Sequence, residues 1–182
     1  AIAMIHQPSV VLRRSSFIGN GIHAHVNEVV DGGAVSFFQA LPTQQDVVIE
    51  DCIFAHNFVP NVLVFDPHRP QAPPTRIPDI ARTNSPTTPA PPPLDITYRP
   101  CGGALFLSTS TNATIVGTTF YNNSAFSGGA LCMPTSLAYS SSVFIDNSSF
   151  VENTCSFLGC GIFYQRGDRS NLFVKRTAFL TN

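Results

Sequence analysis

A four-residue pattern, Phe-x-x-Asn, recurs five times along this 182-residue chain and constrains its fold more than any other feature. Successive copies are separated by 37, 66, 30 and 29 residues. A unit of about 30 residues that holds only short strands cannot bury its own apolar face, so such units must stack on one another. The copies are Phe17 and Asn20, Phe54 and Asn57, Phe120 and Asn123, Phe150 and Asn153, and Phe179 and Asn182.

A second motif, Gly-Gly-Ala followed by an apolar residue, alternates with the first. Its glycine pairs are Gly32 and Gly33, Gly102 and Gly103, and Gly128 and Gly129, with a degenerate copy at residues 159–162. Short alternating apolar runs, at residues 47–49, 114–116, 142–145 and 172–174, lie between the two motifs. We expect the glycine pair to supply the positive φ angles of one bend, with the following Ala pointing inward. We expect each Asn to adopt the left-handed conformation at another bend and to bond to the next layer.

These patterns predict an all-β chain that forms a parallel solenoid of about five coils. Residues of one type then lie above each other at about one strand spacing, roughly 4.8 Å, so the Phe rings form a column in the interior. The alternative is a β-sandwich in which the Phe-Asn turns coincide by chance.

The combination of repeated Gly-Gly-Ala-(Ile/Leu/Val) and Phe-x-x-Asn resembles the repeats of the polymorphic outer membrane proteins of chlamydiae. The resemblance covers residues of about 10–60 and 101–182. It implies a right-handed parallel β-helix of the pectin-lyase-like type. Most members of that family are adhesins or surface structural proteins. The residues that match the repeat are structural, so the resemblance implies no catalytic residue.

A proline-rich insertion divides the solenoid. Residues 66–100 contain eleven prolines and are expected to leave the stack as an extended loop. We therefore expect β-helix coils in residues 1–65, the inserted loop in 66–100, and coils of the same domain in 101–182. The run at residues 84–91 resembles the Ser/Thr/Pro modules of O-glycosylated or hydroxyproline-rich extracellular proteins, and its alternative is a bare flexible loop. Neither end carries a polar cap, which predicts a piece of a longer β-helix.

Composition excludes two classes of function. The formal net charge is -1 and only 12% of residues are charged, so electrostatic binding of nucleic acid is not expected. Uninterrupted apolar runs, such as those at residues 47–49 and 104–107, are far shorter than the roughly 20 residues of a membrane-spanning helix.

The five cysteines do not follow a zinc-binding pattern, because no two of them are spaced as C-x2-C. Cys155 and Cys160 are close enough in sequence for a local disulfide, and Cys101 and Cys132 each flank a Gly-Gly-Ala motif. The alternative is that several are buried thiols, and the sequence leaves the pairing open. Three N-glycosylation sequons, at Asn112, Asn122 and Asn147, favour secretion in a eukaryote, and the alternative is that they occur by chance in a chain rich in Asn, Ser and Thr.

Three groups of residues are candidate functional sites, and each has a simpler interpretation. His23 and His25 are two residues apart and face the same side of an expected strand, and His56 on the next layer could supply a third metal ligand. Without a nearby carboxylate or cysteine, the simpler interpretation is that these histidines are exposed and bind no metal. The tripeptide Arg166-Gly167-Asp168 is one that integrins recognise, and Gly-Asp is also a turn signal. A polysaccharide-cleaving enzyme needs clustered carboxylates. The acidic residues considered for that role are Asp46, Glu50, Asp51, Asp146, Glu152 and Asp168.

These acidic residues lie mostly in different expected layers, which favours solvated charges at strand edges. The sequence therefore predicts a non-enzymatic extracellular or cell-surface β-helix that serves as a structural rod or as an adhesion and assembly module. We expect no catalytic, cofactor or metal site, and we expect other protein chains of a surface assembly, and glycans, as partners. The alternative function is a polysaccharide lyase or hydrolase built on a pectin-lyase-like β-helix.

Overall fold

The computed structural model describes residues 2–5, 9–21, 32–38, 45–60, 100–108, 111–134, 141–165 and 170–182. Every regular element among these residues is a β-strand, and all strand pairs are parallel. The prediction of an all-β chain whose parallel strands stack in sheets is therefore confirmed. The proline-rich residues 66–99 lie outside the described part of the chain.

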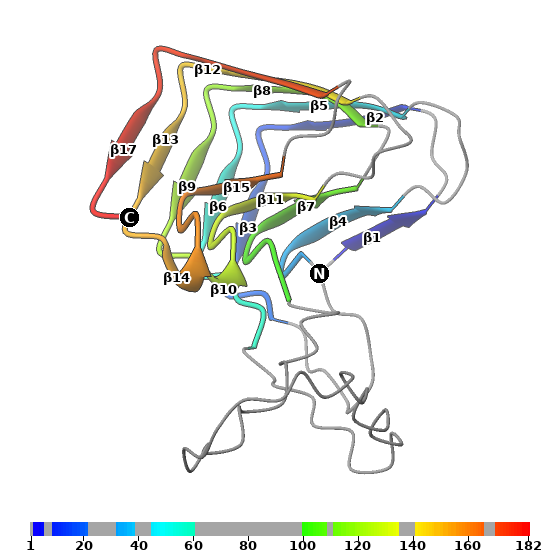
Figure 1. Cartoon of the computed structure of the whole chain (residues 1–182). Helices are drawn as coiled ribbons and strands as arrows, with labels where there is room; N and C mark the ends of the chain where they lie inside the picture. The colour runs from blue at the N-terminus through cyan, green and yellow to red at the C-terminus, as the bar shows by residue number, and fades with distance from the viewer. Residues whose placement is uncertain are drawn as a thin grey trace, which may run out of the picture.

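Three five-stranded sheets make up most of the molecule, and Figure 1 shows the strands of each sheet lying one behind another. Each sheet takes one strand from each successive stretch of chain. The first sheet contains β1 (Ile2–Ile5), β4 (Val35–Phe38), β7 (Leu105–Leu107), β11 (Leu131–Met133) and β15 (Ile162–Tyr164). The second contains β2 (Ser9–Arg13), β5 (Gln45–Glu50), β8 (Thr111–Val116), β12 (Ser141–Asp146) and β16 (Ser170–Lys175). The third contains β3 (Ser16–Ile18), β6 (Ile53–Ala55), β9 (Thr119–Tyr121), β13 (Ser149–Val151) and β17 (Ala178–Leu180).

Alternation of apolar and polar residues explains the orientation of the second sheet. In β5, Val47 and Ile49 are buried, whereas Asp46, which directly precedes Val47, is exposed. The parallel register places Ile49 beside Ile115 of β8 and keeps the same side chains on the interior face. Because side chains alternate between the two faces of a strand, a slip of one residue would move this apolar row into solvent.

The repeated phenylalanines form one continuous interior column. Their ring centroids are 4.8, 5.1, 4.6 and 5.0 Å apart along the column, with planes within 9° of parallel. Phe54, Phe120 and Phe150 are fully buried. The spacing matches the distance between neighbouring strands, so each strand pairing also stacks one ring on the next.

The two glycines of each Gly-Gly-Ala motif have different roles. The first has a positive φ, for example 76° at Gly102, and the second does not. A Cβ at Gly103 would lie 2.1 Å from the carbonyl oxygen of Gly129. The expectation that both glycines supply positive φ angles is therefore wrong, because the second allows the backbones of neighbouring coils to approach closely. The alanine that follows, as at Ala104, is fully buried, as expected.

A fourth, two-stranded sheet of β10 (Ser124–Ser127) and β14 (Thr154–Leu158) follows the Asn residues of two coils. Its register shifts between Ala125 and Ser127, so β14 contains one extra residue.

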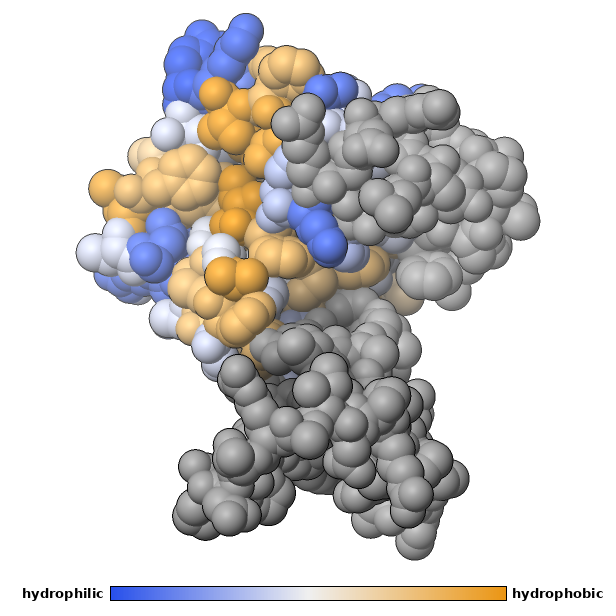
Figure 2. Space-filling model, in the orientation of Figure 1, coloured by the Kyte–Doolittle hydropathy of each residue, from blue (hydrophilic) through white to orange (hydrophobic). Residues whose placement is uncertain are grey.

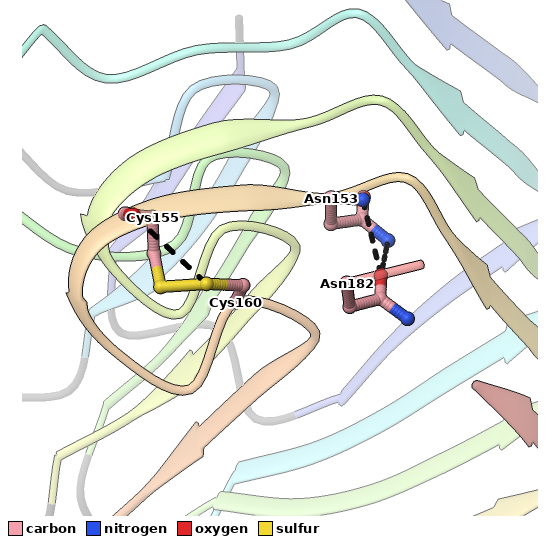
Figure 3. Close-up of a disulfide and its surroundings, with 4 residues drawn as sticks. All are labelled: Asn153, Cys155, Cys160 and Asn182. Carbon is pink, nitrogen blue, oxygen red and sulfur yellow. Dashed lines mark hydrogen bonds between the residues drawn. A yellow bond between two sulfur atoms is a disulfide. The ribbon is translucent and has the colours of Figure 1, made fainter. Parts of the chain in front are cut away.

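Two disulfides lie near these strands. One joins Cys101 to Cys132 with a Cα–Cα distance of 5.6 Å, and the other joins Cys155 to Cys160 at 4.7 Å (Figure 3). Both bonds join cysteines that the sequence leaves as candidate pairs.

Candidate functional site

The asparagines of the Phe-x-x-Asn motifs form a hydrogen-bonded ladder through the stack. The backbone N–H and the side-chain Nδ2 of Asn57 both donate to Oδ1 of Asn123, at 3.0 and 2.9 Å. The same two bonds join Asn123 to Asn153, and Asn153 to Asn182 as Figure 3 shows. The second proton of each Nδ2 goes to a backbone carbonyl, for example from Asn123 to Phe54 at 2.9 Å. Buried amides are thereby satisfied inside the protein.

The left-handed conformation belongs to the residue before each of these asparagines and not to the asparagine itself. His56 has a φ of 56° and Glu152 a φ of 53°, whereas Asn57 and Asn153 are not among the residues with positive φ. The expectation that the Asn occupies the left-handed position is therefore wrong. The turn needs its left-handed residue one position earlier, so that the following Asn side chain enters the interior. The residues in this position are Gly19, His56, Asn122, Glu152 and Thr181.

A second polar column, which sequence reasoning missed, lies two residues before each Phe. Thr118 Oγ1 donates to the carbonyl oxygen of Val116 at 3.1 Å and accepts from the backbone N–H of Cys52 at 3.4 Å. Ser148 repeats both contacts one coil further along. The sequence does contain a signal for this column, because the position two residues before each Phe of the Phe-x-x-Asn motif is always a small residue with a hydroxyl or a thiol. These residues are Ser15, Cys52, Thr118, Ser148 and Thr177.

Two of the acidic residues form ion pairs between neighbouring coils. Arg176 donates from Nε to Oδ1 of Asp146 at 2.9 Å, and Arg13 Nε lies 2.6 Å from Oε2 of Glu50. The hydrogen bond from Arg176 lowers the pKa of Asp146 below its usual value, against the opposing effect of burial. A general acid needs a raised carboxyl pKa, so Asp146 is shifted in the opposite direction.

The other described carboxylates also contact neighbouring coils. Asp46 Oδ1 accepts from Nδ2 of Asn112 at 3.2 Å. Asp51 lies next to Gly117, where Oδ1 would be 2.5 Å from an added Cβ. Glu152 raises the pKa of Tyr121, first by accepting a hydrogen bond from its hydroxyl and second by its charge. Asp46 and Glu152 are therefore engaged with side chains of neighbouring coils, and Asp51 lies beside the backbone of one.

His56 takes part in a polar cluster at an exposed corner. Its Nδ1 is 3.1 Å from Nδ2 of Asn122, and its ring meets the edge of Tyr121 at a centroid distance of 5.2 Å. His23 and His25, and the tripeptide Arg166-Gly167-Asp168 with its acidic residue, lie outside the described residues. Within the described ranges, no three His, Cys, Asp or Glu side chains are grouped so that they could hold a metal ion.

The three sequons occupy different environments. Asn122 and Asn147 are exposed at corners, with φ values of 48° and 46°. Asn112 is half-buried on β8 and its amide is bonded to Asp46. An N-linked glycan can project without displacing a strand contact at the two corner positions, so these suit attachment better than Asn112.

Exposed apolar side chains gather where the last strands of the stack lie. Figure 2 shows hydrophobic residues on the left side of the molecule, where Figure 1 places β17. Phe179 and Leu180 of that strand are 48% and 55% exposed. Phe157 and Leu158, next to the Cys155–Cys160 disulfide, are also exposed. No helix in the described segments is both long enough and apolar enough to span a membrane.

Comparisons of the chain with known family models, with characterised proteins and with solved structures gave no match in any of the three. The contacts made by the described residues therefore carry the functional conclusion. Those contacts are the Phe column, the two polar columns and the ion pairs between coils, and all of them join one stretch of chain to the next.

Proposed function

We propose that the chain is part of a non-enzymatic extracellular or cell-surface protein that serves as a structural rod or as a module for adhesion and assembly. In this proposal the stacked strands are a right-handed parallel β-helix of about five coils, related to the polymorphic outer membrane protein repeats. The proline-rich residues 66–100 form a loop that leaves the rod and returns to it. Partners are other protein chains of a surface assembly, and glycans.

One observation carries the proposal: the repeated side chains contact the neighbouring coil. Phe120 stacks between Phe54 and Phe150, and Asn123 bonds to Asn57 and to Asn153. Side chains engaged in this way stiffen the stack and are not available to bind or transform a substrate. A chain built from such contacts needs no cofactor for its stability, since main-chain ladders and buried columns hold every coil to the next.

Two further observations support an extracellular location. Disulfides such as Cys101–Cys132 and Cys155–Cys160 persist mainly in oxidising compartments. The sequons at Asn122 and Asn147 lie at exposed corners, where a glycan clears the strands.

The alternative of a polysaccharide lyase or hydrolase receives less support. A retaining glycosidase needs two carboxyl groups roughly 5 Å apart, one with a raised pKa. Asp146 and Glu50 are instead paired with arginines of neighbouring coils, and the pKa of Asp146 is lowered. Incubation with acidic polysaccharides, followed by assay for new reducing ends or unsaturated products, is expected to give no turnover above buffer.

Peptide mapping of the natively produced protein, without reduction, tests the proposal. We expect disulfide-linked peptides that contain Cys101 with Cys132 and Cys155 with Cys160. We also expect a glycan on at least one of Asn122 and Asn147. A chain with five free thiols and no modified asparagine would contradict the extracellular assignment and would reopen the enzymatic one.

A further inference from the structure

The interior of the stack has a polar region where the strands of the second sheet begin. Gln45 of β5 is paired in register with Thr111 of β8, and Ser141 of β12 with Ser170 of β16. Side chains alternate along a strand, so these positions share the interior face with the apolar residues two positions later, such as Val47. Gln45 and Thr111 are 0% and 1% exposed.

Several polar atoms in this region are buried without a hydrogen-bond partner. They include Oγ1 of Thr111 and the hydroxyl of Tyr164, which comes from β15 of the first sheet. Other buried polar side chains of the described interior have partners, as in the ladder formed by Asn57 and Asn123. Burying a hydroxyl without a partner costs free energy, and native proteins usually fill such a gap with protein or water.

Thr111 and Tyr164, whose hydroxyls lack partners, both line the same small cavity. Its remaining walls are mostly apolar and include Leu107, Met133 and Val143. The space open to the centre of a water molecule is about 10 Å³. That is about the size needed for one water molecule and too small for a sugar or another organic ligand.

We propose that this cavity is a binding site for one ordered water molecule, held by Oγ1 of Thr111 and the hydroxyl of Tyr164. Each hydroxyl can donate one hydrogen bond and accept others, so one water can satisfy both groups. The water then joins β8 to β15 across the interior. It supplies the polar contact that the ladders of Asn and Thr side chains supply elsewhere in the stack.

Tyr164 is shared between this cavity and a neighbouring pocket. The same side chain lines a second, wider pocket of about 250 Å³ together with Ser170, Asn171, Leu172 and Phe173.

A double-mutant cycle tests the site. The variants are Thr111→Val, Tyr164→Phe and the double variant, with Thr114→Val on the outer face of the same strand as the control. If one water links the two hydroxyls, each single variant leaves the water with one partner. Each should then lower the Tm by about 3 °C. The double variant should lose less than the sum of the singles, because both partners are then removed together. The control should leave the Tm unchanged.

Detection of the water completes the test. Water-to-protein NOEs, or density at high resolution, should place one ordered water between the two hydroxyls of the wild type and none in the double variant. Single variants that raise the Tm, effects that add within error, or an empty cavity in the wild type would each overturn the proposal. If the cavity is dry, Thr111→Val should raise the Tm, because valine then removes a buried polar group that had no partner.

Discussion

Asn123 accepts two hydrogen bonds from Asn57 at a single oxygen: its Oδ1 lies 3.0 Å from the backbone nitrogen and 2.9 Å from Nδ2 of that residue. Both residues are fully buried. One amide side chain therefore satisfies two donors of the neighbouring coil, and the same geometry repeats through the column. A single substitution in the ladder leaves a buried backbone N–H of one neighbouring coil without its acceptor and removes a side-chain bond to the other.

Asn123→Ala is expected to destabilise the protein strongly. It leaves the backbone N–H of Asn57 buried without a partner and removes the hydrogen bonds that join this side chain to Nδ2 of Asn57 and to the carbonyl of Phe54, so we expect a loss of about 3 kcal/mol in the free energy of unfolding. Urea denaturation measures this loss. The adjacent Asn122→Gly is the matched control, because Asn122 is exposed and its positive φ suits glycine. Similar losses for both variants would show that the ladder is not the cause.

Phe120→Ala or Phe150→Ala should open a cavity in the ring column and cost about 3–5 kcal/mol. Both rings are fully buried and stack on each other with centroids 4.6 Å apart. Phe144→Ala on the outer face, where Lys175 lies over the ring at 5.7 Å, should cost much less. Thermal unfolding distinguishes these cases. Interior variants that melt like the parent would show that the rings do not form the core.

Thr118→Val tests the second polar column. The change removes the acceptor for the N–H of Cys52 and the donor to the carbonyl of Val116, so we expect a loss of about 2 kcal/mol in the free energy of unfolding. Thr118→Ser keeps the hydroxyl and should recover most of that loss. Cys52→Ser should also be tolerated, because Ser15, Ser148 and the threonines occupy the same position in other coils. Equal effects of Val and Ser at position 118 would rule out a role for the hydroxyl.

Low pH should weaken the contact between Asp146 and Arg176. The folded pKa of Asp146 lies below its usual value of 3.8, so the unfolded chain binds a proton more readily than the folded chain between these two values. The stabilisation is fully present above about pH 4 and is lost as the pH falls through the folded pKa. Arg176→Gln should remove this part of the pH dependence, which urea denaturation between pH 2 and pH 6 measures. An unchanged pH profile in that variant would contradict the assignment.

The stacked sheets could be predicted from sequence because the interior residues recur by type. Phe and Asn repeat at a spacing close to one coil, and that periodicity alone implies that like residues stack. The column that contains Cys52 and Thr118 was missed because its members are of three residue types, Ser, Thr and Cys. They share only a hydroxyl or thiol group on Cβ.

Other features depend on three-dimensional neighbours that no local pattern specifies. The second glycine of the Gly-Gly-Ala motif is required by the carbonyl of Gly129 beside Gly103, a contact between coils. The left-handed position is occupied by residues as different as His56 and Glu152. Its left-handed conformation is therefore set by the geometry of the turn and not by the propensity of the residue that occupies it. The buried hydroxyls of Thr111 and Tyr164 lie on different sheets and come together only in the folded interior.

Hydrogen exchange at the backbone amides of Asn57 and Asn123 tests most directly whether the repeats are locked together by side-chain ladders. These amides donate to asparagine side chains of the neighbouring coil and not to a strand. The ladder predicts exchange only through global unfolding, as slow as that of the central strand amides. Exchange at the rate of solvent-exposed loops would contradict it, because the two amides would then lack the partners on which the stacked architecture depends.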